Sequence, residues 1–317
     1  MLSGKEKGRS LPSSPGAGRG RGSASLYDDE VFAAFRAITI SHHWDGPCES
    51  AASFIRRTGF GPSLHRHDGG EIRGTPRNTL PLPQIIEEAC QEAEIYKAAG
   101  VDGLIVENMH DRPYTVGVGA EITAAMAVIC ATVKQTCPRL PVGVQILSAA
   151  NQDAIAVALA AGLDFIRAEG FVFSHVADEG ILNACAGKLL RYRKQIGAEH
   201  IQVFADVKKK HSSHALTADV SVAETAKAAE FFLADGVILT GAATGLEADP
   251  KELEEVGCAV KIPVLVGSGV TLENLKNYLG ANALIVGSYF KKESYWANNI
   301  DPDRVKRFMD YAAELRV

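Results

Sequence analysis

Ionisable side chains stand at the ends of several short apolar runs. Glu107-Asn108 follows GLIV, Arg167 lies within FIRAEG, and Asp206 follows IQVFA. Charged groups at the ends of buried strands carry a desolvation cost, so they are paired with one another or kept for function. Carboxylates, lysine and histidine are the groups that move protons or stabilise developing charge. We therefore predict five catalytic residues: Glu107, Asn108, Asp206, Lys210 and His211. Asp206 or Glu107 would be the base, and Lys210 or His211 the acid or stabilising group.

Glycine and serine follow three later apolar runs. Glycines let backbone N–H groups approach a phosphate closely, although each of these motifs alone is also an ordinary turn or packing motif. The predicted phosphate-binding residues are Gly241, Gly267, Ser268, Gly269, Gly287 and Ser288. Further polar residues of the same loops are expected around them: Asp111, Arg167, Thr240 and Thr244. If the phosphate site is real, Gly267→Asp should abolish binding and leave the fold intact.

The run Lys208-Lys209-Lys210 has two alternative interpretations. It is either a solvated basic turn or part of the site, and a lysine there also allows Schiff-base chemistry. With Asp206 and Lys210 at the site, Asp206→Asn should remove activity with little loss of stability, and Lys209→Ala should be nearly silent.

No metal centre and no particular cofactor are predicted. The N-terminal segment contains loosely clustered histidines, but no scaffold around them would orient a ligand set. These histidines are His42, His43, His65 and His67.

The elements that must position these side chains alternate along the chain. Helical stretches with apolar residues at i, i+3, i+4 and i+7 are separated by nearly continuous Val/Ile/Leu runs, which are typical of strands buried on both faces of a parallel sheet. Predicted strands lie near 103–107, 142–147, 164–168, 202–206, 236–240, 263–267 and 283–287. The repeating unit among them is two strand–helix modules, which favours a TIM-type (β/α)₈ barrel, and the functional residues of such a barrel lie at the strand C-termini.

The first strand of this barrel is missing or replaced. At 66–74, where the period places it, the chain reads RHDGGEIRG, and the nearest apolar run is VFAAFRAITI at 31–40. We therefore predict a disordered or poorly structured extension at 1–73 and a barrel domain at 74–317. A protease-resistant core that begins before residue 40 would contradict this division.

Composition restricts the class of protein. The net charge of −5 argues against binding of nucleic acid, and 46% hydrophobic with 22% charged residues is ordinary for a soluble globular protein. No apolar run reaches the roughly 20 residues that cross a bilayer. The six scattered cysteines indicate reduced thiols and an intracellular, cytoplasmic location. The Arg- and Ser-rich residues 1–25 leave a mitochondrial location as the alternative.

Motifs spread over residues 74–317 resemble the BtpA/SgcQ family. They include GTPRN, AAGVDGLIVENMHDRPY, ADVKKKH, DGVILTGAATG, PVLVGSGVTLENL and ALIVGSYFKK. The resemblance implies a TIM-type barrel, and it implies roles at Glu107, Asn108, Asp111, Asp206, Lys210 and His211, at Thr240, Gly241, Thr244 and Gly245, and at Gly267 to Val270. The family's first strand, with its histidine, is absent here. Arg167-Ala168-Glu169 also departs from the family's pattern.

Two functions are compatible with these observations. The first is binding of a phosphorylated sugar or nucleotide-like metabolite, with acid/base chemistry of an isomerase, lyase or hydrolase type. The second, which the resemblance implies through a cyanobacterial member named for photosystem I biogenesis, is a non-catalytic assembly or stability factor. That member also leaves peripheral membrane association open. A homo-oligomer is compatible with both functions.

Overall fold

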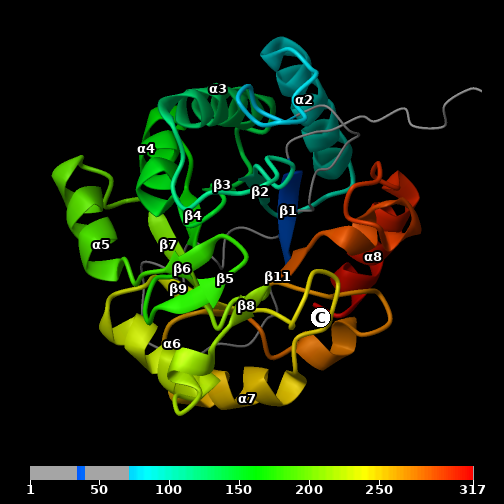
Figure 1. The fold of residues 1–317 in the computed structure, drawn as a ribbon. Coiled ribbons are helices and arrows are strands. Elements are labelled where there is room, and N and C mark those ends of the chain that lie inside the picture. Colours follow the sequence, from blue (N-terminus) through cyan, green and yellow to red (C-terminus); the bar gives the residue numbers. More distant parts are fainter. Residues whose placement is uncertain (1–33, 40–70, 317) are drawn as a thin grey trace, which may run out of the picture.

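Parallel strands that alternate with helices line up side by side in a closed barrel (Figure 1). The computed structural model describes residues 34–39 and 71–316. The parallel strands are β2 (Leu104–Glu107), β3 (Val142–Gln145), β4 (Phe165–Ala168), β7 (Gln202–Val207), β9 (Gly236–Leu239), β10 (Val264–Val266) and β11 (Ala283–Val286). They follow one another around the barrel in chain order, and every consecutive pair is parallel. The predicted barrel and its strand positions are confirmed.

The place of the first strand is taken by β1 (Ala34–Thr39), which runs antiparallel to both of its neighbours. Ala34 pairs with Glu107 of β2 at the mouth of the barrel, and Thr39 pairs with Leu284 of β11. Without it, β2 and β11 would present unpaired backbone groups at two sheet edges, so an extended segment in either direction satisfies them. The first strand is therefore replaced, as predicted, and its direction is reversed.

Helices between the strands form a ring around the barrel (Figure 1). They are α2 (Leu82–Ala98), α3 (Ala120–Thr136), α4 (Asn151–Ala161), α5 (Ala186–Gln195), α6 (Val222–Phe231), α7 (Pro250–Ala259) and α8 (Pro302–Glu314). None of the helices in 71–316 is long and apolar enough to span a membrane. The alternation of strands and helices predicts a helix after β10 as well, but the chain forms only the short 3₁₀ helix η2 (Leu275–Tyr278) there. Asn274 Oδ1 accepts from Thr271 N–H and Thr271 Oγ1 accepts from Asn274 N–H, which is the reciprocal arrangement of a helix N-terminus, but the chain continues from it only as this short 3₁₀ helix.

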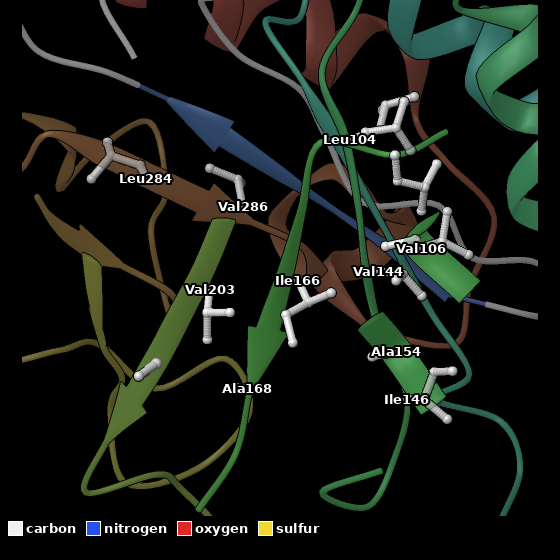
Figure 2. Packing of buried hydrophobic residues seen from close by; sticks show 14 of the residues in the cluster. Leu104, Val106, Val144, Ile146, Ala154, Ile166, Ala168, Val203, Leu284 and Val286 are labelled. Atoms are coloured by element: carbon white, nitrogen blue, oxygen red, sulfur yellow. The ribbon is translucent and has the colours of Figure 1, made fainter. Parts of the chain in front are cut away.

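The strands bury both faces. Val106, Val144, Ile166 and Val203 point outward into the layer between barrel and helices (Figure 2), and a second cluster fills the barrel interior. The interior cluster consists of Ile105, Phe165, Phe204, Ile238, Leu265, Ala283 and Ile285.

Glycines on neighbouring strands make room for the two interior phenylalanines. A Cβ atom at Gly143 would lie 2.1 Å from the ring of Phe165, and one at Gly236 would lie 2.6 Å from Phe204. Large and small residues thus interlock below the mouth and form a closed floor for the polar residues above them.

A small second sheet is built from the loops that follow β4 and β7. It consists of β5 (His175–Ala177), β6 (Gly180–Leu182) and β8 (Ser212–Ser213), in the order β6-β5-β8. Because both loops begin at strand C-termini, this sheet lies on the mouth side of the barrel.

Candidate active site

Four polar side chains form a layer at the mouth-side ends of β2, β3, β4 and β7. Each stands two residues beyond an interior position, which is Ile105, Phe165 or Phe204 of the interior cluster or Gly143 against the Phe165 ring, so by the alternation of a strand it also faces inward. These residues are Glu107, Gln145, Arg167 and Asp206, and all four are at least nine-tenths buried. Three of them were predicted from the sequence.

Arg167 and Asp206 form a bidentate ion pair across β4 and β7. Nε donates to Oδ1 and Nη2 to Oδ2, both at 2.9 Å. Burial opposes the charge of Arg167, but Asp206 outweighs it and raises the pKa of the guanidinium. Both carboxylate oxygens of Asp206 thus hold a buried cation. We therefore expect Asp206→Asn to destabilise the fold, contrary to the expectation from the sequence that it would cost little stability.

Oε1 of Gln145 and Nη1 of Arg167 have no hydrogen-bond partner within the described part of the chain. Each belongs to a residue that is 2% exposed. Leaving a buried donor or acceptor unsatisfied costs about 1–3 kcal/mol, so native proteins keep few of them. Gln145 was not among the predicted site residues, although an amide inside the run VGVQIL was a visible signal.

A second buried ion pair stands beside the first. Nζ of Lys209 lies 3.1 Å from Oε1 of Glu169, and both side chains are less than one-tenth exposed. Burial alone would raise the pKa of Glu169, but the Lys209 ammonium brings it below its usual value. Ala149 N–H also donates to Glu169, at 3.0 Å. Lys209 points into the protein, so the interpretation of 208–210 as a solvated basic turn is wrong for this residue, and the alternative expectation of a nearly silent Lys209→Ala loses its basis.

Asn108 and Asp111 connect the end of β2 to two other segments. Asn108 Oδ1 accepts from Leu147 N–H at 2.7 Å, and its amide donates to Asp111 Oδ2 at 2.8 Å. Asp111 Oδ1 accepts from Ile72 N–H at 2.9 Å. Burial raises the pKa of Asp111 to about 6 against the effect of these hydrogen bonds. Both side chains hold the loops of the mouth in place.

A cavity of about 80 Å³ opens on the opposite side of the mouth, between the loops that follow β7, β9, β10 and β11. Five of the six predicted phosphate-binding residues line it: Gly267, Ser268, Gly269, Gly287 and Ser288. The lining also includes Met109, Lys210, Thr244, Tyr289 and Ser294. The sixth, Gly241, is absent from the lining and packs below the loop, where a Cβ atom would lie 2.3 Å from Leu246 O.

Three residues of the loop after β10 differ in what they offer a ligand. Gly267 N–H already donates to Leu239 O at 2.7 Å, and a Cβ atom there would lie 2.7 Å from Ile238. Gly267→Asp would thus strain the barrel, contrary to the expectation of an intact fold. Ser268 Oγ donates to Leu246 O at 2.8 Å and holds the loop after β9. Gly269 has φ +65°, and a Cβ atom would lie 2.4 Å from Leu246 backbone atoms, so glycine is required.

The lysines and the histidine after β7 separate into different environments. Lys210 lines the cavity, and its N–H donates to Thr240 Oγ1 at 3.2 Å. Nε2 of the exposed His211 lies 2.8 Å from Thr244 Oγ1, at the edge of the cavity. Lys208 turns away, because its Nζ donates to Thr217 O at 2.8 Å.

No group of three or more His, Cys, Asp or Glu residues within 71–316 is arranged to hold a metal ion. The histidines of the N-terminal segment that were considered above lie outside the described residues.

Comparison with solved structures finds distant barrels. Thiamine phosphate pyrophosphorylase from Pyrococcus furiosus matches with a TM-score of 0.48 and 16% identity, over 73% of this chain and 90% of that one. Phosphoribosyl anthranilate isomerase from Thermus thermophilus matches with a TM-score of 0.47 and 13% identity, over 72% and 95%. Likenesses this distant carry no information on substrate.

Sequence comparison finds closer relatives. A Caenorhabditis elegans protein named as uncharacterised and mitochondrial is 48% identical over 77% of this chain and 90% of its own length. The photosystem I biogenesis protein BtpA of Synechocystis is 36% identical over 74% of this chain and 81% of its own. An uncharacterised protein of Archaeoglobus fulgidus is 37% identical over 75% and 93%. The model of the BtpA family matches residues 67–314, and the chain belongs to this family.

Proposed function

We propose that this protein binds a phosphorylated small metabolite at the mouth of its barrel and carries out acid/base chemistry on it. One observation carries the proposal: a cavity lined by glycine and serine loops after β10 and β11, with Lys210 at its wall, opens on the same mouth as a buried layer of titratable groups. In barrels of this type the loops after the last two strands are the usual phosphate site.

The loop after β10 supplies the donors that such an anion needs. The N–H groups of Ser268, Gly269 and Val270 donate to no protein acceptor among the described residues. Gly269 lets the backbone turn without a side chain in the way, and Ser268 fixes the loop from below. Backbone N–H groups together with an ammonium are a common way to bind phosphate.

Lys210 provides the test. In an isothermal titration of the full chain with inorganic phosphate, we expect Lys210→Met to weaken binding about tenfold or more, because a hydrogen bond to a charged group contributes about 1.5–3 kcal/mol. Lys208→Met is the matched control and should bind phosphate as the unmodified chain does, since Lys208 Nζ bonds Thr217 O. No phosphate binding by the unmodified chain, or equal losses in both variants, would overturn the proposal.

A second candidate function is that of an assembly or stability factor without catalysis. It is favoured by apolar side chains exposed on the small sheet and the turn beside it, Val176 at 41%, Ile181 at 61% and Leu216 at 66%, and by the name of the Synechocystis relative. Replacing Ile181 and Leu216 with serine should then abolish the assembly or stabilising function in cells and leave phosphate binding intact. If that assembly or stabilising function survives the replacement, this candidate fails.

For the location of the protein, the name of the Caenorhabditis elegans relative favours mitochondria over the cytoplasm. Fractionation of cells that express the full chain with a C-terminal tag tests this. Tagged protein in the cytosolic fraction alone would contradict it.

A further inference from the structure

Gln145 and Arg167, whose Oε1 and Nη1 atoms have no partner among the described residues, lie on adjacent strands. β3 and β4 pair in parallel with Gly143 opposite Phe165 and Val144 opposite Ile166, and this register continues to place Gln145 beside Arg167. Both side chains face the barrel interior, one layer above the Phe165 ring. The side chains of Gln145 and Arg167 thus lie on neighbouring strands at the floor of the mouth, where Oε1 of Gln145 and Nη1 of Arg167 bond neither each other nor another described residue.

These two groups need different partners on a ligand. Nη1 of Arg167 can only donate a hydrogen bond, so it needs an oxygen acceptor. Oε1 of the Gln145 amide can accept a hydrogen bond from a hydroxyl group. Neighbouring carbonyl and hydroxyl oxygens of a small molecule complement this pair, and neither of them carries a charge.

The charges around the pair argue against a carboxylate at this position. Asp206 already occupies Nε and Nη2 of Arg167, so the guanidinium charge is balanced within the protein. Lys209 balances Glu169 in the same way. Glu107, whose charge also acts on Arg167, adds a further anion to the layer, so an anionic ligand group is favoured instead on the Lys210 side.

The cavity and the polar layer meet at Met109. This side chain lines the cavity and packs against Leu147. Met109 and Leu147 belong to the loops that leave β2 and β3, two residues beyond Glu107 and Gln145 of the layer. A thioether side chain is flexible, and its displacement would extend the cavity toward the polar layer.

We propose that the substrate is a sugar phosphate, whose uncharged hydroxyl and carbonyl oxygens bind Gln145 and Arg167 while its phosphate occupies the cavity beside Lys210. A phosphorylated carboxylic acid is disfavoured. Gln145 is then a residue that determines specificity. This inference rests on the proposed function.

The test compares three probes by isothermal titration of the full chain: inorganic phosphate, ribose 5-phosphate and 3-phosphoglycerate. We expect ribose 5-phosphate to bind at least tenfold more tightly than phosphate, and 3-phosphoglycerate no more tightly than phosphate. Gln145→Met should bring ribose 5-phosphate to within about threefold of phosphate and leave the affinity for phosphate unchanged. Gln202→Met is the matched control and should change neither affinity, because Gln202 also has a buried, unpartnered Oε1 but opens β7 at the opposite end of the barrel.

The outcomes separate this inference from the function beneath it. If phosphate binds and all three probes have equal affinity, or if 3-phosphoglycerate is preferred, the inference is wrong and the phosphate site stands. If phosphate does not bind, the proposed function itself fails. The comparison of probes on the unmodified chain decides the inference even where Gln145→Met does not fold. A loss of ribose 5-phosphate affinity in Gln202→Met that matches the loss in Gln145→Met would also overturn the role of Gln145.

Discussion

Replacing Lys209 with methionine removes the cation from a buried ion pair and keeps a side chain of similar length. Glu169, which lies 3.1 Å from the lysine, then remains buried without its counter-charge. Breaking such a pair from one side costs about 3–5 kcal/mol. We expect the lower end, about 3 kcal/mol at pH 8, because Glu169 keeps the Ala149 N–H donor.

The same reasoning fixes the sign of the pH dependence. In the unmodified chain the Lys209 ammonium overcomes burial and lowers the pKa of Glu169, so the pair stabilises the fold above the unfolded pKa of about 4.3, and this contribution is lost as the pH falls. Without Lys209, burial prevails and the folded pKa of Glu169 lies above the unfolded one. The destabilisation is then largest at pH 8 and shrinks as the pH falls through the raised pKa.

Thermal unfolding followed by tryptophan fluorescence at pH 5.5 and pH 8 measures both effects. A loss of about 3 kcal/mol lowers the Tm by roughly 6–12 °C for a domain of this size. Lys208→Met should lose about 1.5 kcal/mol or less at both pH values, because it gives up one partly exposed hydrogen bond to Thr217 O and leaves no buried charge behind. Adding Glu169→Gln to Lys209→Met should restore part of the loss at pH 8. If Lys209→Met unfolds at the Tm of the unmodified chain at both pH values, the reasoning is refuted.

Two further predictions concern the barrel. Asp206→Asn leaves the Arg167 guanidinium buried without its counter-charge and should lower the free energy of unfolding, measured by urea titration, by about 3–5 kcal/mol. The double variant Arg167→Met with Asp206→Leu should recover most of this loss. An unchanged urea midpoint in the single variant would contradict the pairing. Gly143→Ala places a Cβ atom 2.1 Å from Phe165 and should lower the free energy of unfolding by about 1–3 kcal/mol. Gly257→Ala, in helix α7 with nothing within 4 Å of its Cβ atom, should raise that free energy by about 0.5–1 kcal/mol. Thermal unfolding of both variants checks this, and equal effects would contradict the packing.

The parallel part of the barrel could be predicted because each buried strand is a nearly continuous apolar run and each helix carries one apolar stripe. The same patterns placed Arg167, Asp206 and the glycine loops at the mouth. The direction of β1 could not be predicted, since an apolar run such as 31–40 is equally compatible with a parallel and an antiparallel strand. β1 occupies its place in the barrel because β2 and β11 would otherwise have unpaired edges, and these edges exist only in the assembled sheet.

Side-chain orientation beyond the strand ends could not be predicted. Period-two alternation ends with β7, and the positive φ values of Lys208 (45°) and His211 (54°) turn the chain so that Lys209 and Lys210 take different environments. Partners such as Glu169 and Lys209 are 40 residues apart in sequence, so only the fold brings them together. The domain boundary at 73/74 stays a prediction, which limited proteolysis tests.

A crystal structure of the full chain with ribose 5-phosphate tests the central claim most directly. We expect the phosphate between the loops of Gly269 and Ser288 with Lys210 beside it, Met109 displaced, and the sugar oxygens at Gln145 and Arg167. A ligand bound outside the mouth, or a mouth that stays empty at saturating ligand, would contradict the account.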